Sequence, residues 1–137
     1  MRFNPVHLVA LVALLQTDFS VGANEVYNYN ITASIRDLTT AQGIPNLPLT
    51  LSRLRGDDWI IVSKGKTEAN GQLDFTSTKY KYARGTYKLR YDVRNHYNVT
   101  FYPFVDITFV VSSLLKRYAF PVLLDEYGYG TYLGVFN

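Results

Sequence analysis

The chain has 137 residues, a formal net charge of +3 and no cysteine. This length is enough for one domain with a modest hydrophobic core, and the lack of cysteine excludes a disulfide framework. The charges are scattered rather than gathered into one long basic block, which argues against a nucleic-acid partner. Stability must therefore come from packing within the chain and from association between copies of it.

The first 23 residues have the pattern of a secretory signal peptide. Arg2 provides a positively charged start, residues 6–15 are mainly apolar, and residues 21–23 (Val-Gly-Ala) offer a cleavage site. The apolar stretch is too short to cross a membrane comfortably, so we expect no membrane anchor. The sequence thus predicts a signal peptide at 1–23 and a secreted, extracellular domain at 24–137.

Two Asn-X-Thr sequons give weak additional support for secretion. They begin at Asn30 and Asn98, and both are candidate glycosylation sites in a secreted chain. Because a glycan is bulky and hydrated, each asparagine is predicted to lie on the surface.

Short segments rich in β-branched and aromatic residues recur along the predicted domain, separated by Gly, Pro and Asn. The clearest is 85–93, where Tyr87, Leu89 and Tyr91 alternate with charged residues. No helical period persists for three turns, and only the irregular segment 94–103 has room for one short helical turn. We therefore predict an all-β fold, a two-sheet sandwich of seven to eight short strands with at most one short helix. The predicted strands are 31–38, 47–54, 59–63, 73–75, 85–93, 104–111, 118–124 and 131–136.

The predicted strand 118–124 has no polar face, since residues 120–124 are five apolar residues in a row. A strand of this kind is covered on both sides, so it lies in a core or at a subunit interface. In a domain without disulfides, this predicts a homotetramer, or at least a dimer.

Several motifs, taken together in their order and spacing, resemble those of the transthyretin and 5-hydroxyisourate hydrolase family. Residues 118–132 read Tyr-Ala-Phe-Pro-Val-Leu-Leu-Asp-Glu-Tyr-Gly-Tyr-Gly-Thr-Tyr, similar to the family's Tyr-X-X-Pro-Leu-Leu-Leu-Ser-X-Tyr-X-Tyr-Ser-Thr-Tyr. Trp59 followed by Gly-Lys-Thr-Glu-Ala-Asn-Gly at 65–71, and Gly-Thr-Tyr-Lys at 85–88, also fit the family pattern. The resemblance implies a transthyretin-like sandwich, assembled as a dimer of dimers around a ligand channel. We expect Trp59, which opens an apolar strand, to be buried or pressed against a neighbouring strand.

The resemblance also implies where a catalytic set would lie. The family's hydrolases open 5-hydroxyisourate, a product of urate oxidation, by adding water with two His, two Arg and a Tyr. Such a step needs a base and cations that stabilise developing negative charge. The matching positions here hold Ser34, Gln72, Ala119, Tyr132 and Leu133. Only Tyr132 is retained, although a two-residue shift in the loop at 39–45 would place Arg36 at the first His position instead.

Nothing else in the sequence replaces that set. His96 is the only His in 24–137, and we interpret it as a surface or packing residue rather than a catalytic one. There is no Ser/His/Asp order, phosphate-binding loop or cluster with metal-ligand spacing, so we predict neither a cofactor nor a metal.

These observations lead to three hypotheses. The first is a secreted transthyretin-like protein that has lost the hydrolase chemistry and binds a small ligand or a partner at an oligomer channel. Since the family places the last turn and strand at this channel, the candidate ligand-binding residues are Tyr127, Tyr129, Tyr132 and Leu133. The second is an active 5-hydroxyisourate hydrolase of purine degradation, which would form the ureido-imidazoline carboxylate. The third is a structural extracellular protein without a ligand, and the sequence does not separate it from the first.

Overall fold

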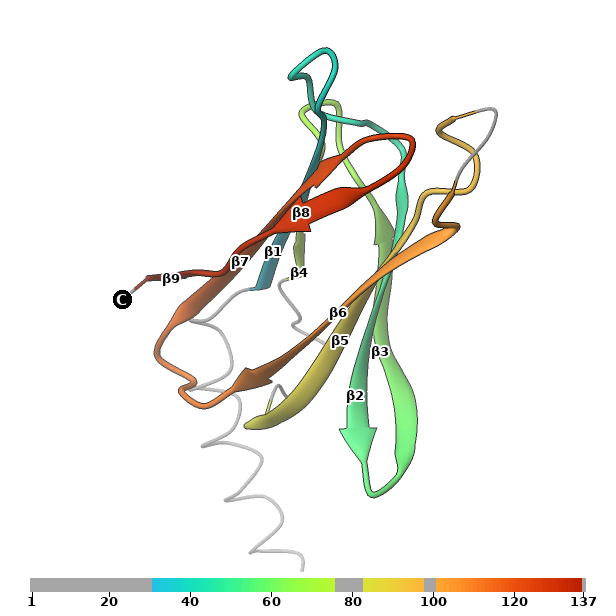
Figure 1. The fold of residues 1–137 in the computed structure, drawn as a ribbon. Helices are drawn as coiled ribbons and strands as arrows, with labels where there is room; N and C mark the ends of the chain where they lie inside the picture. Colours follow the sequence, from blue (N-terminus) through green and yellow to red (C-terminus); the bar gives the residue numbers. More distant parts are fainter. Residues whose placement is uncertain (1–30, 76–82, 98–100, 137) are drawn as a thin grey trace, which may run out of the picture.

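The structure is a computed structural model that describes residues 31–75, 83–97 and 101–136 (Figure 1). The predicted signal peptide and both sequon asparagines, Asn30 and Asn98, lie outside these ranges. The described residues form nine strands and no helix, and none belongs to a helix that could span a membrane. The strands are β1 Ile31–Asp37, β2 Pro48–Arg55, β3 Asp58–Lys66, β4 Gln72–Phe75, β5 Gly85–Asp92, β6 Phe104–Val111, β7 Arg117–Leu124, β8 Tyr129–Thr131 and β9 Gly134–Phe136.

The predicted two-sheet sandwich is confirmed. One sheet has the order β4-β1-β7-β8, with β9 also paired to β7, and the other has the order β3-β2-β5-β6. In Figure 1 the two sheets pack face to face with their strands crossing at an angle. β1 and β7 form the parallel pair, and the remaining pairs between named strands are antiparallel.

The count of seven to eight strands is low by one because the last predicted strand forms two. β8 pairs with the end of β7, where Tyr129 lies opposite Leu124, and β9 pairs with its beginning, where Gly134 lies opposite Ala119. Residues 132–133 leave the ladder between them, so the two short strands run along one neighbour in succession.

Alternating side chains of the central strands build the core, as strand geometry requires. The buried residues of these strands are Ile31, Ala33 and Ile35 of β1, Tyr87, Leu89 and Tyr91 of β5, and Phe120, Val122 and Leu124 of β7. The Tyr91 hydroxyl, fully buried, donates a hydrogen bond of 2.8 Å to the Phe120 carbonyl and so joins the two sheets. A buried hydroxyl needs such a partner, because an unpaired polar group in the core is costly.

Two glycines fix how the chain crosses from one sheet to the other. The tight turn at 69–71 connects β3 of one sheet to β4 of the other. Gly71 has φ 81°, and a Cβ there would lie 2.5 Å from the Ile35 carbonyl oxygen and 2.7 Å from the Cα of Gly43. Only glycine combines this conformation with such close backbone contact.

Trp59 is not buried, contrary to the first of its two predicted environments. Its exposed fraction is 37%, and its neighbours Ile60 and Ile61 are exposed as well. The reason is that its side chain lies on the side of the sheet that faces away from the core, the side of Lys88, which alternates with the buried Tyr87 and Leu89 of β5; the β2–β3 hairpin that carries it is at the lower end of the sandwich in Figure 1. The ring is nevertheless held against the sheet, with the Lys88 amine of β5 4.4 Å from the ring centroid.

Candidate active site on the outer face of the five-stranded sheet

The side of the five-stranded sheet that points away from the core is called the outer face here. Residues that alternate with the buried ones along β1 and β7 point to this side. They are Thr32, Ser34 and Arg36 of β1 and Ala119, Pro121 and Leu123 of β7.

Three of the sequence-predicted positions meet on this face. Ser34 lies directly opposite Gln72 in the β1–β4 pair. Ala119 lies beside Thr32 in the parallel β1–β7 pair and opposite Gly134 in the β7–β9 pair. Positions that are distant in the sequence are thus neighbours on one surface. The alternative position, Arg36, lies on the same face, but its guanidinium donates a hydrogen bond of 3.0 Å to the Ala41 carbonyl and is held by that loop.

The C-terminal candidates are spread more widely. Tyr132 and Leu133 lie in the link between β8 and β9, with exposed fractions of 64% and 52%. Tyr129 pairs with Leu124, whose side chain is in the core, so Tyr129 points to the core side of the sheet and not to the outer face. There its ring packs edge-on against Tyr102, with 5.6 Å between centroids. Tyr127 is in the turn before β8 and is largely exposed.

The polar groups of the outer face are satisfied by their neighbours. The Thr32 hydroxyl donates to the Asp74 carboxylate at 2.8 Å. The Gln72 side-chain oxygen accepts from the Asn70 amide at 3.2 Å. Within the described part of the chain this face carries no imidazole, and beside Ala119 it is apolar, with the Phe136 ring lying against Gly134.

The one described imidazole lies in the loops at one end of the sandwich. His96 Nε2 is 3.2 Å from Asp37 Oδ2, and the Tyr97 hydroxyl donates to the same oxygen at 2.9 Å. The main-chain N–H groups of Thr39 and Thr40 bond the other oxygen of Asp37. Burial alone would raise the pKa of Asp37, but these four hydrogen bonds outweigh it and lower the pKa to about 2. Burial and the adjacent Asp37 raise the pKa of Tyr97.

Sequence reasoning did not find this cluster, because Asp37 and His96 are 59 residues apart and neither lies in a recognisable motif. The interpretation of His96 as a surface or packing residue remains a prediction. What the structure adds is a carboxylate partner that holds one of its ring nitrogens.

The comparisons with known proteins agree with this fold. The sequence model of the HIUase/Transthyretin family matches residues 31–134. A 5-hydroxyisourate hydrolase of Mus musculus is 31% identical over 105 residues, which cover 71% of this chain and 89% of the relative. A probable 5-hydroxyisourate hydrolase of Caenorhabditis elegans is 27% identical over 126 residues, or 89% of this chain and 93% of the relative.

A crystal structure of transthyretin from Sparus aurata has a TM-score of 0.71 at 20% identity and covers 78% of this chain and 97% of that one. A sea bream transthyretin in complex with thyroxine has a TM-score of 0.70 at 21% identity, covering 77% of this chain and 94% of that one. These two likenesses concern the fold alone. With the family match over most of its length, the chain belongs to the HIUase/Transthyretin family.

Proposed function

We propose that this protein is a secreted transthyretin-like protein that has lost the hydrolase chemistry and binds a small, apolar ligand on the outer face. One observation supports the proposal: Ser34 lies opposite Gln72, and Ala119 lies on the same face, two residues along β7 from Pro121, the neighbour of Ser34. None of these residues supplies a base that titrates near neutral pH or a fixed positive charge. Hydrolysis of a cyclic amide with developing negative charge requires both.

The side chains of this surface favour an apolar ligand over an anionic one. Ala119 and Gly134 lie opposite each other with the Phe136 ring beside Gly134, and Pro121 and Leu123 continue the apolar strip along β7. A flat or aromatic molecule would bury apolar area there. The thyroxine complex of the sea bream transthyretin supports a small ligand for this chain as well, although no described side chain selects thyroxine.

The proposal includes a homotetramer, a dimer of dimers, whose channel covers the outer face. In a single chain the outward residues of β7 are only half-buried, and four large apolar residues at the C-terminal end are exposed. These are Tyr132, Leu133, Val135 and Phe136. Association would remove this surface from water, which monomers rarely leave exposed.

Secretion and glycosylation are part of the same proposal. The signal peptide pattern of 1–23 and the sequons at Asn30 and Asn98 support them. Expression in a eukaryotic cell line should deliver protein that begins near Asn24 to the medium, with a mass that falls on glycosidase treatment. Retention of the full-length chain inside the cells would contradict this part.

An active 5-hydroxyisourate hydrolase is the second candidate, favoured by the names of the relatives in Mus musculus and Caenorhabditis elegans. Catalysis would then depend on Tyr132, Ser34 and a bound water. The two candidates differ in one observable, the decay rate of 5-hydroxyisourate, while binding of a ligand tests the first candidate directly.

The binding test uses the uncharged fluorescent probe Nile red with the native protein and two matched variants. Ala119→Gln places a polar side chain on the apolar floor, and Thr50→Gln makes a similar change on the outward side of β2 in the other sheet. We expect saturable binding by the native protein, a loss of about tenfold or more in Ala119→Gln because the amide has no partner there, and little change in Thr50→Gln. Equal binding by all three proteins would place the probe elsewhere and contradict the proposal.

A further inference from the structure

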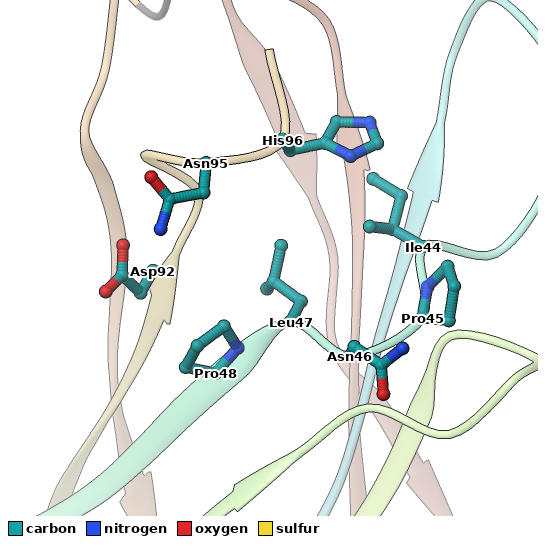
Figure 2. Close-up of a pocket in the computed structure, with 8 residues that line it drawn as sticks. All are labelled: Ile44, Pro45, Asn46, Leu47, Pro48, Asp92, Asn95 and His96. Atoms are coloured by element: carbon teal, nitrogen blue, oxygen red, sulfur yellow. The ribbon is translucent and has the colours of Figure 1, made fainter. Parts of the chain in front are cut away.

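A hollow at the loop end of the sandwich has the features of a second ligand site. Eight residues line it: Ile44, Pro45, Asn46, Leu47, Pro48, Asp92, Asn95 and His96 (Figure 2). Its volume is about 230 Å³, below the roughly 300–1,000 Å³ of sites for drug-sized ligands. Ile44 and Leu47 are almost fully buried and form an apolar floor, so a ligand in this hollow would be small and partly apolar.

The loop that forms one wall is held rigidly. The hydroxyl of Thr67, a buried residue, donates to the Ile44 carbonyl at 2.6 Å and accepts from the Leu47 N–H at 2.9 Å. Asn46, between them, has φ 57° and points its carboxamide away from the centre of the hollow in Figure 2. The wall is therefore formed before any ligand arrives, which lowers the entropic cost of binding.

His96 is oriented in the same way, by Asp37. An ionised carboxylate can only accept hydrogen bonds, so the contact to Asp37 requires the proton on Nε2. In the neutral imidazole, Nδ1 then carries a free lone pair. Figure 2 shows a ring nitrogen of His96 on the side toward Ile44 and the hollow. The hollow thus offers an oriented hydrogen-bond acceptor above an apolar floor.

The Asp92 carboxylate in the lining is already paired with a cation of the protein, so it does not require a cationic ligand. The Arg94 guanidinium bonds both oxygens of Asp92, with Nε 3.0 Å from Oδ1 and a terminal nitrogen 2.8 Å from Oδ2. Among the charged groups facing this end, Asp37 is held by four hydrogen bonds and Asp92 by this ion pair. A ligand carboxylate would lie near the Asp92 carboxylate and the lone pair of His96 and would find no Lys or Arg among the lining residues, so an anion is disfavoured.

We propose that this hollow binds a small uncharged molecule that carries an N–H or O–H donor next to an apolar group, with the donor bonded to His96 Nδ1. The Asn95 carboxamide at the rim is free to bond a second polar atom of the same ligand, because it can both donate and accept. This site is separate from the outer face of the five-stranded sheet and does not depend on the function proposed for that face.

The test compares two probes of nearly the same shape, benzamide and benzoate, by NMR titration of the methyl groups of Ile44 and Leu47 in the folded protein. Benzamide has an N–H donor and no charge, whereas benzoate has only acceptors and a negative charge. Benzamide should give saturable shifts with a Kd on the order of millimolar, as its few atoms allow. Benzoate should bind at least about threefold more weakly, the effect of one hydrogen bond. Equal responses, or no saturable shift from benzamide, would overturn the proposal.

Two variants separate binding from loop structure. His96→Phe keeps a ring of similar shape but removes both nitrogens, and should weaken benzamide about three- to tenfold. Tyr97→Phe also removes one hydrogen bond from Asp37, yet Tyr97 does not line the hollow, so benzamide binding should stay within about twofold. Equal loss in the two variants would show that only the loop structure matters. Binding of benzamide by Ala119→Gln at the native level would separate this site from the outer face.

Discussion

Single polar side chains hold the loop end of the sandwich together. The Thr67 hydroxyl bridges two main-chain groups of the loop at Ile44 and Leu47, and the Asp37 carboxylate accepts four hydrogen bonds from two segments. Each such group is buried or nearly so, and each would cost more as an unpaired group than its bond contributes. The end of the fold that carries the hollow is therefore defined by a few hydrogen bonds rather than by apolar packing.

The carboxylate of Asp37 makes the stability of the protein depend on pH in a defined direction. Its folded pKa, about 2, is below the ordinary 3.8. Its contribution is therefore complete above pH 4–5 and is lost as the pH falls toward 2. The shift corresponds to at most about 2 kcal/mol of unfolding free energy at pH 7, less some solvent screening. Asp37→Asn should lose up to this amount at pH 7, and urea titration should show the gap to the native protein narrowing to roughly half at pH 3. A gap that stays constant with pH would assign the loss to packing instead.

At the scale of the strands, periodicity alone predicted the central elements well. The alternation in 85–93 gave β5 and its buried Tyr87, Leu89 and Tyr91, because a strand in the middle of a sheet faces the core along its whole length. Exposure at Trp59 could not be predicted in this way, since residues 59–62 are all apolar and do not show which side chains face away from the core. The division of the last strand into β8 and β9 likewise depends on a tertiary break at residues 132–133 that no local pattern marks.

The two candidate sites also differ in how far the sequence could predict them. The family resemblance named Ser34, Gln72 and Ala119, and the strand register puts all three on one face, with Ser34 opposite Gln72 and Ala119 beside Thr32. The family resemblance also named residues of the last turn and of the link between β8 and β9. Of these, Tyr129 lies on the core side of the sheet, packed against Tyr102. The contact of His96 with Asp37 joins two loops far apart in the sequence, and neither loop has a pattern that identifies its partner.

The different environments of Trp59 and Phe120 predict different costs of truncation. Phe120 is 3% exposed, so Phe120→Ala should cost about 3–5 kcal/mol of unfolding free energy. Trp59→Ala should cost less than about 1.5 kcal/mol, mainly the cation–π contact with Lys88 and partial burial. Urea titrations at one fixed protein concentration compare the two variants. A loss at Trp59 equal to that at Phe120 would mean that assembly buries the β2–β3 hairpin.

At the scale of the whole molecule, the apolar C-terminal end and the outer face imply more than one chain. Sedimentation equilibrium at micromolar protein should give a mass near four times that of one chain, whose full-length mass is 15.7 kDa. Leu133→Lys should shift the distribution toward smaller species, because it places a charge among exposed apolar residues at the proposed interface. Lys116→Leu, in the loop before β7, serves as a control that changes charge elsewhere. A native protein that stays monomeric at high concentration would contradict the channel, and with it the proposed ligand site.

We propose that this protein has the fold of the family but that the outer face of its five-stranded sheet lacks the hydrolase chemistry. Stopped-flow absorbance of freshly generated 5-hydroxyisourate, mixed with purified protein, tests it most directly, with the Mus musculus enzyme as a positive control. A folded variant carrying Ser34→His, Gln72→Arg, Ala119→His and Leu133→Arg should accelerate the decay, because it returns a base and fixed positive charge to one surface. The native protein should leave the decay at the rate of the buffer blank, and saturable acceleration by the native protein would contradict the account.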